Sequence, residues 1–246
     1  MSNQDYDIKI GRTEITVPHG DKRIIFIHPS KGPDNYVNVM EQILNDGLKL
    51  PTGEYTASLV HAAYCGPEEV NKNSFKFSFP VSSIRDVMKN NRIWVPNKNL
   101  WIPANQQNSG VFVVYDEKGV GLTKPLDQGE LEKALEDGEE ITINGTKIKV
   151  SKDRKIRFAS RDTYEGGFQS HEDFAKNGFV VASYLEGANK LSEVSKTFNN
   201  SPRVWILDPI NPEQRVSAVG GYVGGLWFDG NGFGGYGRGL AFGVLK

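Results

Sequence analysis

The first third of the chain combines strand patterns with two helical patterns. Apolar and polar residues alternate near the N-terminus, and a short apolar run that stops at Pro29 follows; both patterns are typical of strands. Apolar residues then recur twice at helical spacing, with Gly47 as a helix stop and Thr52 as an N-cap. The predicted order is strand, strand, helix and helix, at residues 7–17, 23–28, 34–47 and 53–64.

The rest of the chain up to residue 207 predicts a mixture of strands and short helices. The clearest element is a hairpin over 140–150, because Asn144-Gly145 supplies the positive φ values that a two-residue turn needs. Ser170 begins a capping-box-like start to a short helix that Gly178 ends. The other predicted helices cover 82–90, 130–137 and 189–197, and the other predicted strands cover 92–103, 111–115, 179–184 and 203–207.

These elements predict one mixed α+β domain over residues 1–246. The length is sufficient to bury a sizeable core, and the sequence contains neither internal repeats nor a low-complexity linker. The segment at about 116–156 contains a predicted helix and the hairpin, and it is too short for a good core of its own. We therefore interpret this segment as an insertion into the domain.

Composition excludes several classes of protein. The chain has 29 Lys+Arg against 30 Asp+Glu, which argues against a general nucleic-acid binder. No apolar run approaches the ~18–20 residues of a membrane span, and residues 1–9 contain no signal-peptide core. We therefore expect a cytoplasmic or virion-associated protein. Cys65 is the single cysteine, so internal disulfides and CxxC metal knuckles are excluded.

The amino-acid composition changes near the C-terminus. Residues 217–243 contain 11 of the 27 glycines in the chain, one acid, Asp229, and one base, Arg238. Glycine lets the backbone turn tightly, and aromatic side chains offer a large contact area at a low cost in rotamer entropy. Such a composition is typical of a binding surface. The large side chains of this segment are Tyr222, Trp227, Phe228, Phe233, Tyr236 and Phe242.

Two structural alternatives and one motif compete with that interpretation. The segment could be disordered, although Leu226, Leu240 and Val244 give it apolar anchors, or it could form ordinary core strands with tight turns. Residues 230–235 also fit the dinucleotide-binding pattern GxGxxG. We reject that match because a Rossmann loop leads into a helix with an acid ~20 residues later, and no such helix is predicted here.

Three segments in order resemble the C-type lectin fold in its broad, calcium-free sense. Residues 49–63 (LPTGEY leading into ASLVHAA) are similar to a helix start seen in formylglycine-generating-enzyme-like proteins, 204–207 (VWIL) to a strand of that fold, and 218–221 with 238–244 to its glycine-rich end. Within that superfamily, the Gly/aromatic ending most resembles the variable proteins of diversity-generating retroelements of archaea or their viruses. The resemblance implies paired terminal strands, two main helices and a variable ligand-binding segment at about 203–246.

In that family a reverse transcriptase rewrites adenine-templated codons at the 3′ end of the gene, and the fold displays the rewritten side chains to a ligand. The resemblance therefore implies a recognition protein with a protein or cell-surface ligand and with no required cofactor. Asn, Asp and Tyr codons are reachable by adenine replacement, whereas Trp227 is not easily made that way and is a candidate for scaffold, as Phe228 and Phe242 are for core. The candidate ligand-binding residues are Tyr222, Trp227, Asp229, Asn231, Phe233 and Tyr236.

Other functions are less well supported. Formylglycine-generating chemistry requires two cysteines, and the lectin signals for calcium (EPN or QPD, and WND) are absent from the sequence. Its four histidines lack metal-ligand spacing, and His171 lies at a predicted helix start, where capping explains the acids that follow it. We therefore assign neither catalytic nor metal-binding residues. A viral or phage adhesin of the same fold without diversification stays open, as does an enzyme on a formylglycine-generating-type scaffold.

Overall fold

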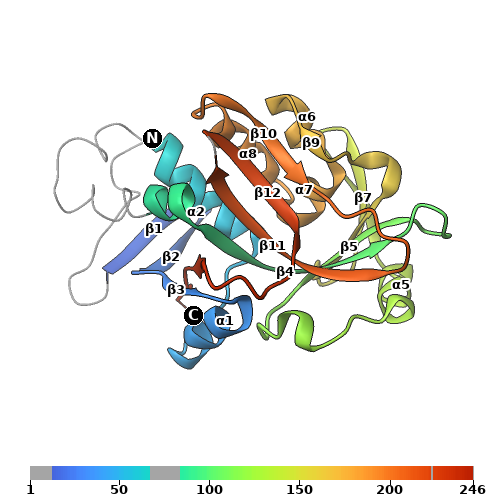
Figure 1. The fold of residues 1–246 in the computed structure, drawn as a ribbon, viewed down its shortest axis with the longest axis horizontal. Helices are drawn as coiled ribbons and strands as arrows, with labels where there is room; N and C mark the ends of the chain where they lie inside the picture. The colour runs from blue at the N-terminus through green and yellow to red at the C-terminus, as the bar shows by residue number, and fades with distance from the viewer. Residues whose placement is uncertain (1–12, 67–83, 223, 246) are drawn as a thin grey trace.

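The computed structural model describes residues 13–66, 84–222 and 224–245 of the chain. A long twisted sheet runs through the molecule, with helices packed against it (Figure 1). The strands are β1 (Thr13–His19), β2 (Lys22–His28), β3 (Lys31–Asp34), β4 (Arg92–Ile102), β5 (Gly110–Tyr115), β6 (Glu139–Ile143), β7 (Thr146–Val150), β8 (Ile156–Ser160), β9 (Gly167–Phe168), β10 (Asn200–Trp205), β11 (Glu213–Tyr222), β12 (Gly225–Gly232) and β13 (Gly239–Ala241).

The helices follow the predicted positions, with ends that differ by a few residues and with one correction described below. Residues 84–90 are helical, while the first residues of the predicted 82–90 helix and of the predicted 7–17 strand lie outside the described part of the chain. The remaining helices are α1 (Tyr36–Asn45), α2 (Gly53–Cys65), η2 (Gly121–Thr123), α5 (Gln128–Glu136), η3 (Arg161–Thr163), α6 (His171–Lys176), α7 (Gly178–Tyr184) and α8 (Gly187–Ser195).

The prediction of a strand over 179–184 is wrong, because this segment forms helix α7. The Asn177 side chain caps the helix by accepting hydrogen bonds from the backbone N–H groups of Phe179 and Val180. Every residue of α7 is buried, so the helix lacks a polar face. A short, wholly apolar run gives no periodicity by which a buried helix differs from a buried strand, and the adjacent valines then favour the strand.

The predicted strand pieces of 92–103 form one continuous strand, β4. Pro96 lies inside β4, and the pairing with β11 shifts register between Val95 and Lys98. A bulge of this kind accommodates a residue that has no N–H to donate to the sheet. The carbonyl of Pro96 still accepts a hydrogen bond from the Asp116 N–H, at 2.8 Å.

The α+β fold class is confirmed. Among the described residues, the larger sheet has eleven strands: nine follow the order β6-β7-β8-β5-β4-β11-β12-β10-β9, and β13 joins β3 to β4. Strands β1 and β2 form a separate antiparallel pair. Helices α2, α7 and α8 contribute apolar residues to the core cluster that also contains Phe228 of β12, for example Val60, Val181 and Leu191.

The two ends of the described chain meet, as the prediction of paired terminal strands requires. Strand β13 pairs antiparallel with β3, and the residues after it continue along β2. The Ile27 N–H donates to the Gly243 carbonyl at 2.9 Å, and the Leu245 N–H donates to the Ile25 carbonyl at 3.0 Å. The C-terminal segment is therefore held in place by backbone bonds to the N-terminal strands.

The helix-plus-hairpin segment at 116–156 is present. The turn of its hairpin has the predicted geometry, with φ of 54° at Asn144 and 83° at Gly145. The segment shares the main sheet, since β7 pairs with β8. Helix α5 packs its apolar face, Leu131 and Leu135, in a separate small cluster with residues of β4 and β5 such as Phe112.

Gly230 places β12 close to the helices behind it. A Cβ at this position would lie 2.2 Å from the ring of Phe179 and 2.9 Å from the ring of Trp101. The Gly230 carbonyl also accepts hydrogen bonds from Trp101 Nε1, at 3.1 Å, and from Asn99 Nδ2, at 3.0 Å. The absence of a side chain on this face lets the two rings close directly on the strand.

We expect Gly230→Ala to lower the free energy of unfolding by about 1–3 kcal/mol, the usual cost of an added methyl group in a packed core. Gly235→Ala is the matched control, because a Cβ at Gly235 would have nothing within 4 Å; its effect should stay within about 1 kcal/mol of zero. Chemical denaturation of both variants measures the difference. Equal effects would contradict this account of the strand.

Candidate functional site

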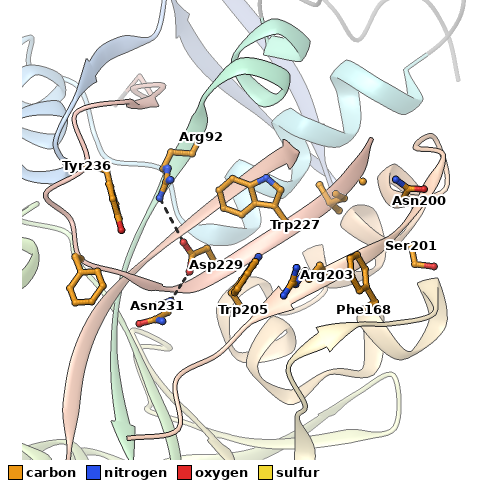
Figure 2. Close-up of a pocket in the computed structure, with 13 residues that line it drawn as sticks. Arg92, Phe168, Asn200, Ser201, Arg203, Trp205, Trp227, Asp229, Asn231 and Tyr236 are labelled. Carbon is orange, nitrogen blue, oxygen red and sulfur yellow. Dashed lines mark hydrogen bonds and ion pairs between the residues drawn. The ribbon is translucent and has the colours of Figure 1, made fainter. Parts of the chain in front are cut away.

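A cavity of about 710 Å³ opens on the outward side of β10 and β12. Figure 2 shows its side chains arranged in a row from Tyr236 to Phe168. Five of the six candidate residues from the sequence line it. The lining residues are Arg92, Phe168, Asn200, Ser201, Arg203, Trp205, Gly225, Leu226, Trp227, Asp229, Asn231, Phe233 and Tyr236.

Strand alternation separates the pocket from the core along β12. Trp227, Asp229 and Asn231 are half-buried on the pocket side. The residues between them are fully buried, and Phe228 stacks on Phe179 with ring centroids 4.7 Å apart. Because successive side chains of a strand point to opposite faces, one strand supplies both the pocket and its foundation.

The register of the sheet aligns the side chains of neighbouring strands. Strand β10 runs parallel to β12, with Arg203 beside Trp227 and Trp205 beside Asp229. On the other side, Gly220 of β11 pairs with Trp227, and a Cβ on Gly220 would lie 2.5 Å from the indole ring. Glycine at this position therefore gives the indole the space that it occupies above β11.

Arg92, at the start of β4, lies between aromatic rings at one end of the pocket. Its guanidinium carbon is 4.8 Å from the Tyr236 ring centroid and 5.5 Å from that of Trp227. Arg92 Nη1 is 3.7 Å from Asp229 Oδ2, an ion pair. Cation–π contacts of this kind contribute about 0.5–1 kcal/mol each at exposed sites, and together they fix the position of the guanidinium.

Arg203 forms a second stack at the other end. Its guanidinium carbon is 3.6 Å from the Trp205 ring centroid and 4.9 Å from that of Phe168, and Figure 2 shows it between the two rings. Its Nε is buried without a hydrogen-bond partner. In the described part of the chain, the Arg203 guanidinium makes these ring contacts and has neither a carboxylate nor a carbonyl partner.

Asp229 is an acid in a largely apolar setting. Burial raises its pKa above the ordinary value, and the hydrogen bond from the Asn231 N–H, 2.8 Å long, and the charge of Arg92 offset only part of that shift. Asn231 Oδ1 in turn accepts a hydrogen bond from Arg215 Nε at 3.0 Å. The Arg215 guanidinium lies under Phe233, 4.1 Å from the ring centroid, so this polar chain supports the edge of the pocket.

The candidate residues that the structure describes lie on the outward side of the sheet and are at least partly exposed. Phe233 is 56% exposed and Tyr236 is 50% exposed, and Asp229 and Asn231 are half-buried on the same side. Phe228 and Phe242 are buried core residues, as expected. Tyr222 ends β11, and its side chain lies outside the described part of the chain.

Sequence reasoning missed the other side of the pocket. Arg203 and Trp205 could have been found, because Arg-Val-Trp in a predicted strand places both on the face opposite the buried Val204. No sequence pattern around Arg92 or Phe168 predicts that they line the pocket. Strand pairings between segments far apart in sequence bring them to the pocket.

Other groups considered in the sequence lie outside the pocket. His171 is the first residue of α6 and hydrogen-bonds through Nδ1 to Ser195 Oγ at 2.7 Å, while Ser170 caps the helix. Cys65 ends α2 and is half-buried, and burial raises the pKa of its thiol. Within the residues that the structure describes, no three His, Cys, Asp or Glu side chains gather as a metal site would require.

A comparison with solved structures identifies a likeness in fold. No known protein family matches this chain, and neither does any curated protein. A solved structure described as "Accommodation of massive sequence variation in Nanoarchaeota by the C-type lectin fold" is similar to it, with a TM-score of 0.47 and 14% sequence identity, over 93% of this chain and 99% of that one. Every helix in the described residues is too short or too polar to cross a bilayer.

We expect Asp229→Asn to gain stability relative to the unmodified protein as the pH rises. The folded pKa lies above the ordinary value of 3.8, so the folded protein binds this proton more tightly than the unfolded chain does. Ionisation therefore destabilises the native protein as the pH rises through that range, and asparagine cannot ionise. Denaturation at about pH 4 and about pH 7 measures both proteins. The quantity compared is the free energy of unfolding of Asp229→Asn minus that of the unmodified protein, and it should rise between the two pH values. A value that stays constant or falls would contradict the raised pKa of Asp229.

Proposed function

We propose that this chain is a ligand-binding protein of the C-type lectin class, whose C-terminal strands display a binding surface on a fixed scaffold. One observation carries the proposal: of the five large apolar side chains exposed among the described residues, four line the pocket. Clustered exposed apolar surface next to polar groups is typical of an interaction site. The four are Phe168, Trp205, Phe233 and Tyr236.

We further propose that the 203–246 segment is diversified by a retroelement of archaeal or viral type. The division of β12 supports this proposal. Its inward positions, such as Phe228 and Gly230, are buried against rings, whereas Asp229 and Asn231 border open space. A solvated side chain contributes little to stability, so outward positions can vary without loss of the fold.

A fixed adhesin of the same fold is the second candidate, and the pocket itself gives it some support. Arg92 and Phe168 lie outside the 203–246 segment, so part of the surface would stay constant. Sequencing the region around the gene separates the two candidates. Diversification requires a near-copy of the 3′ coding segment that differs only at adenines, beside a reverse-transcriptase gene; its absence would favour the adhesin.

The enzyme alternative receives no support from the pocket. Its ionisable lining residues are Arg92, Arg203, Asp229 and Tyr236, which suit binding better than nucleophilic chemistry, since nucleophilic catalysis needs an activated group beside a base. Cys65 is outside the lining. The two arginines stack on rings and Asp229 accepts a hydrogen bond from the Asn231 N–H, and we assign this set to recognition.

We expect Phe233→Ala and Tyr236→Ala each to lower the free energy of unfolding by less than about 1 kcal/mol, the size of one exposed ring–cation contact. Phe228→Ala is the matched control on the inward face, where it is fully buried, and it should cost about 3–5 kcal/mol. Thermal and chemical denaturation of the three variants give the comparison. Loss of the fold in Phe233→Ala or Tyr236→Ala would mean that these rings belong to the scaffold, and the proposed function would fail.

A further inference from the structure

Three hydrogen-bond donors of residues that line the pocket are buried and make no hydrogen bond to the described part of the chain. They are Arg92 Nη1, Arg203 Nε and Trp227 Nε1. A buried N–H group without a partner destabilises a protein by about 1–3 kcal/mol, and native structures contain few of them. Arg203 differs from the other two residues, because it combines an unsatisfied buried N–H with a charge that has no ion-pair partner among the described residues.

The charges around the cavity are unequal. Arg92 pairs with Asp229, whereas Arg203 has no carboxylate partner among the described residues. The pocket therefore carries one positive charge that nothing in it neutralises. A ligand with a single negative group would supply the missing partner.

The geometry of Arg203 suits a planar acid. Trp205 and Phe168 cover the faces of its guanidinium, and Nε is buried, which leaves the terminal Nη N–H groups at the edge of the plane as donors. A carboxylate matches this edge with two parallel hydrogen bonds. Trp227 lies beside Arg203 in the sheet register, so its indole ring offers an apolar surface next to that edge.

The composition of the lining favours a protein ligand. Its large side chains are Arg, Trp, Phe and Tyr, and it contains no lysine. Trp, Tyr and Arg are the residues that dominate binding energy between proteins, and lysine is depleted there. A polyanion such as nucleic acid is bound through many cationic contacts, which a single surplus charge does not provide.

We infer that the pocket, in its proposed role as a binding surface, receives a protein segment that places one carboxylate on the Arg203 guanidinium. An apolar or aromatic side chain of the same segment packs against Trp227 and Tyr236. This assignment rests on the proposed function and adds to it a class of ligand and an anchor residue. The anchor is the first residue of the 203–246 segment.

Two blocked dipeptides test the assignment: acetyl-Phe-Glu-amide and its neutral counterpart acetyl-Phe-Gln-amide. Each is titrated into the ¹⁵N-labelled full chain while the Arg Nε–H and Trp Nε1–H signals are followed by NMR. We expect the glutamyl probe to bind about five-fold tighter or more, as a charge-assisted pair implies, and to shift the Arg203 and Trp227 signals. Arg203→Gln should remove the preference for glutamate.

Arg161→Gln is the matched control. Arg161 also stacks on a ring, with its guanidinium carbon 5.2 Å from the Tyr164 centroid, and it lies outside the pocket lining, so this variant should keep the preference. Thermal unfolding of both variants verifies that they fold. Arg203→Lys keeps the charge and loses the planar fork, and it should retain only part of the preference.

Three results would overturn the inference: equal affinity for the two dipeptides, an unchanged preference in Arg203→Gln, or no binding of either dipeptide. Glucuronate and inorganic phosphate are titrated in the same way. If either one binds tighter than the glutamyl dipeptide and loses this affinity in Arg203→Gln, the ligand of Arg203 is an acidic sugar or a phosphate group, and the peptide carboxylate is wrong. The proposed function is judged separately, by the stability of Phe233→Ala and Tyr236→Ala, so the carboxylate can fail while the binding surface stands.

Discussion

The structure depends on how closely β12 approaches the helices behind it. Gly230 lets the rings of Phe179 and Trp101 touch the strand, and Phe228 stacks on Phe179. These contacts fix the strand in register between β10 and β11. With its inward face anchored in this way, the outward side chains of β12 can hold a defined position without contributing much to the core.

The outward face uses a different set of interactions. Arginines lie between aromatic rings at both ends of the pocket, Arg92 against Tyr236 and Trp227, and Arg203 against Trp205 and Phe168. Each contact is weak, but a planar cation held between rings loses little entropy when it binds a ligand. The surface is therefore ordered before binding, although its polar groups are incompletely satisfied.

The sequence predicts local features well and long-range ones poorly. The hairpin at Asn144-Gly145 follows from turn geometry. Phe228 is buried and Phe233 is exposed, in agreement with their assignment from the sequence to the core and to the binding surface. Helix α7 was missed because a fully buried helix shows no amphipathic period. The positions of Arg92 and Phe168 depend on strand pairings with distant segments, since Arg92 pairs with Gly239 and Phe168 pairs with Arg203. No local sequence pattern predicts such pairings.

The most direct test of the account compares two libraries displayed on the surface of yeast. One randomises the outward residues Asp229, Asn231 and Phe233, and the other randomises the inward residues Phe228, Gly230 and Gly232. Resistance to protease measures the folded fraction of each library. The account predicts that most clones of the outward library and few clones of the inward library stay resistant. Equal loss of resistance in both libraries would contradict a binding face that is independent of the scaffold.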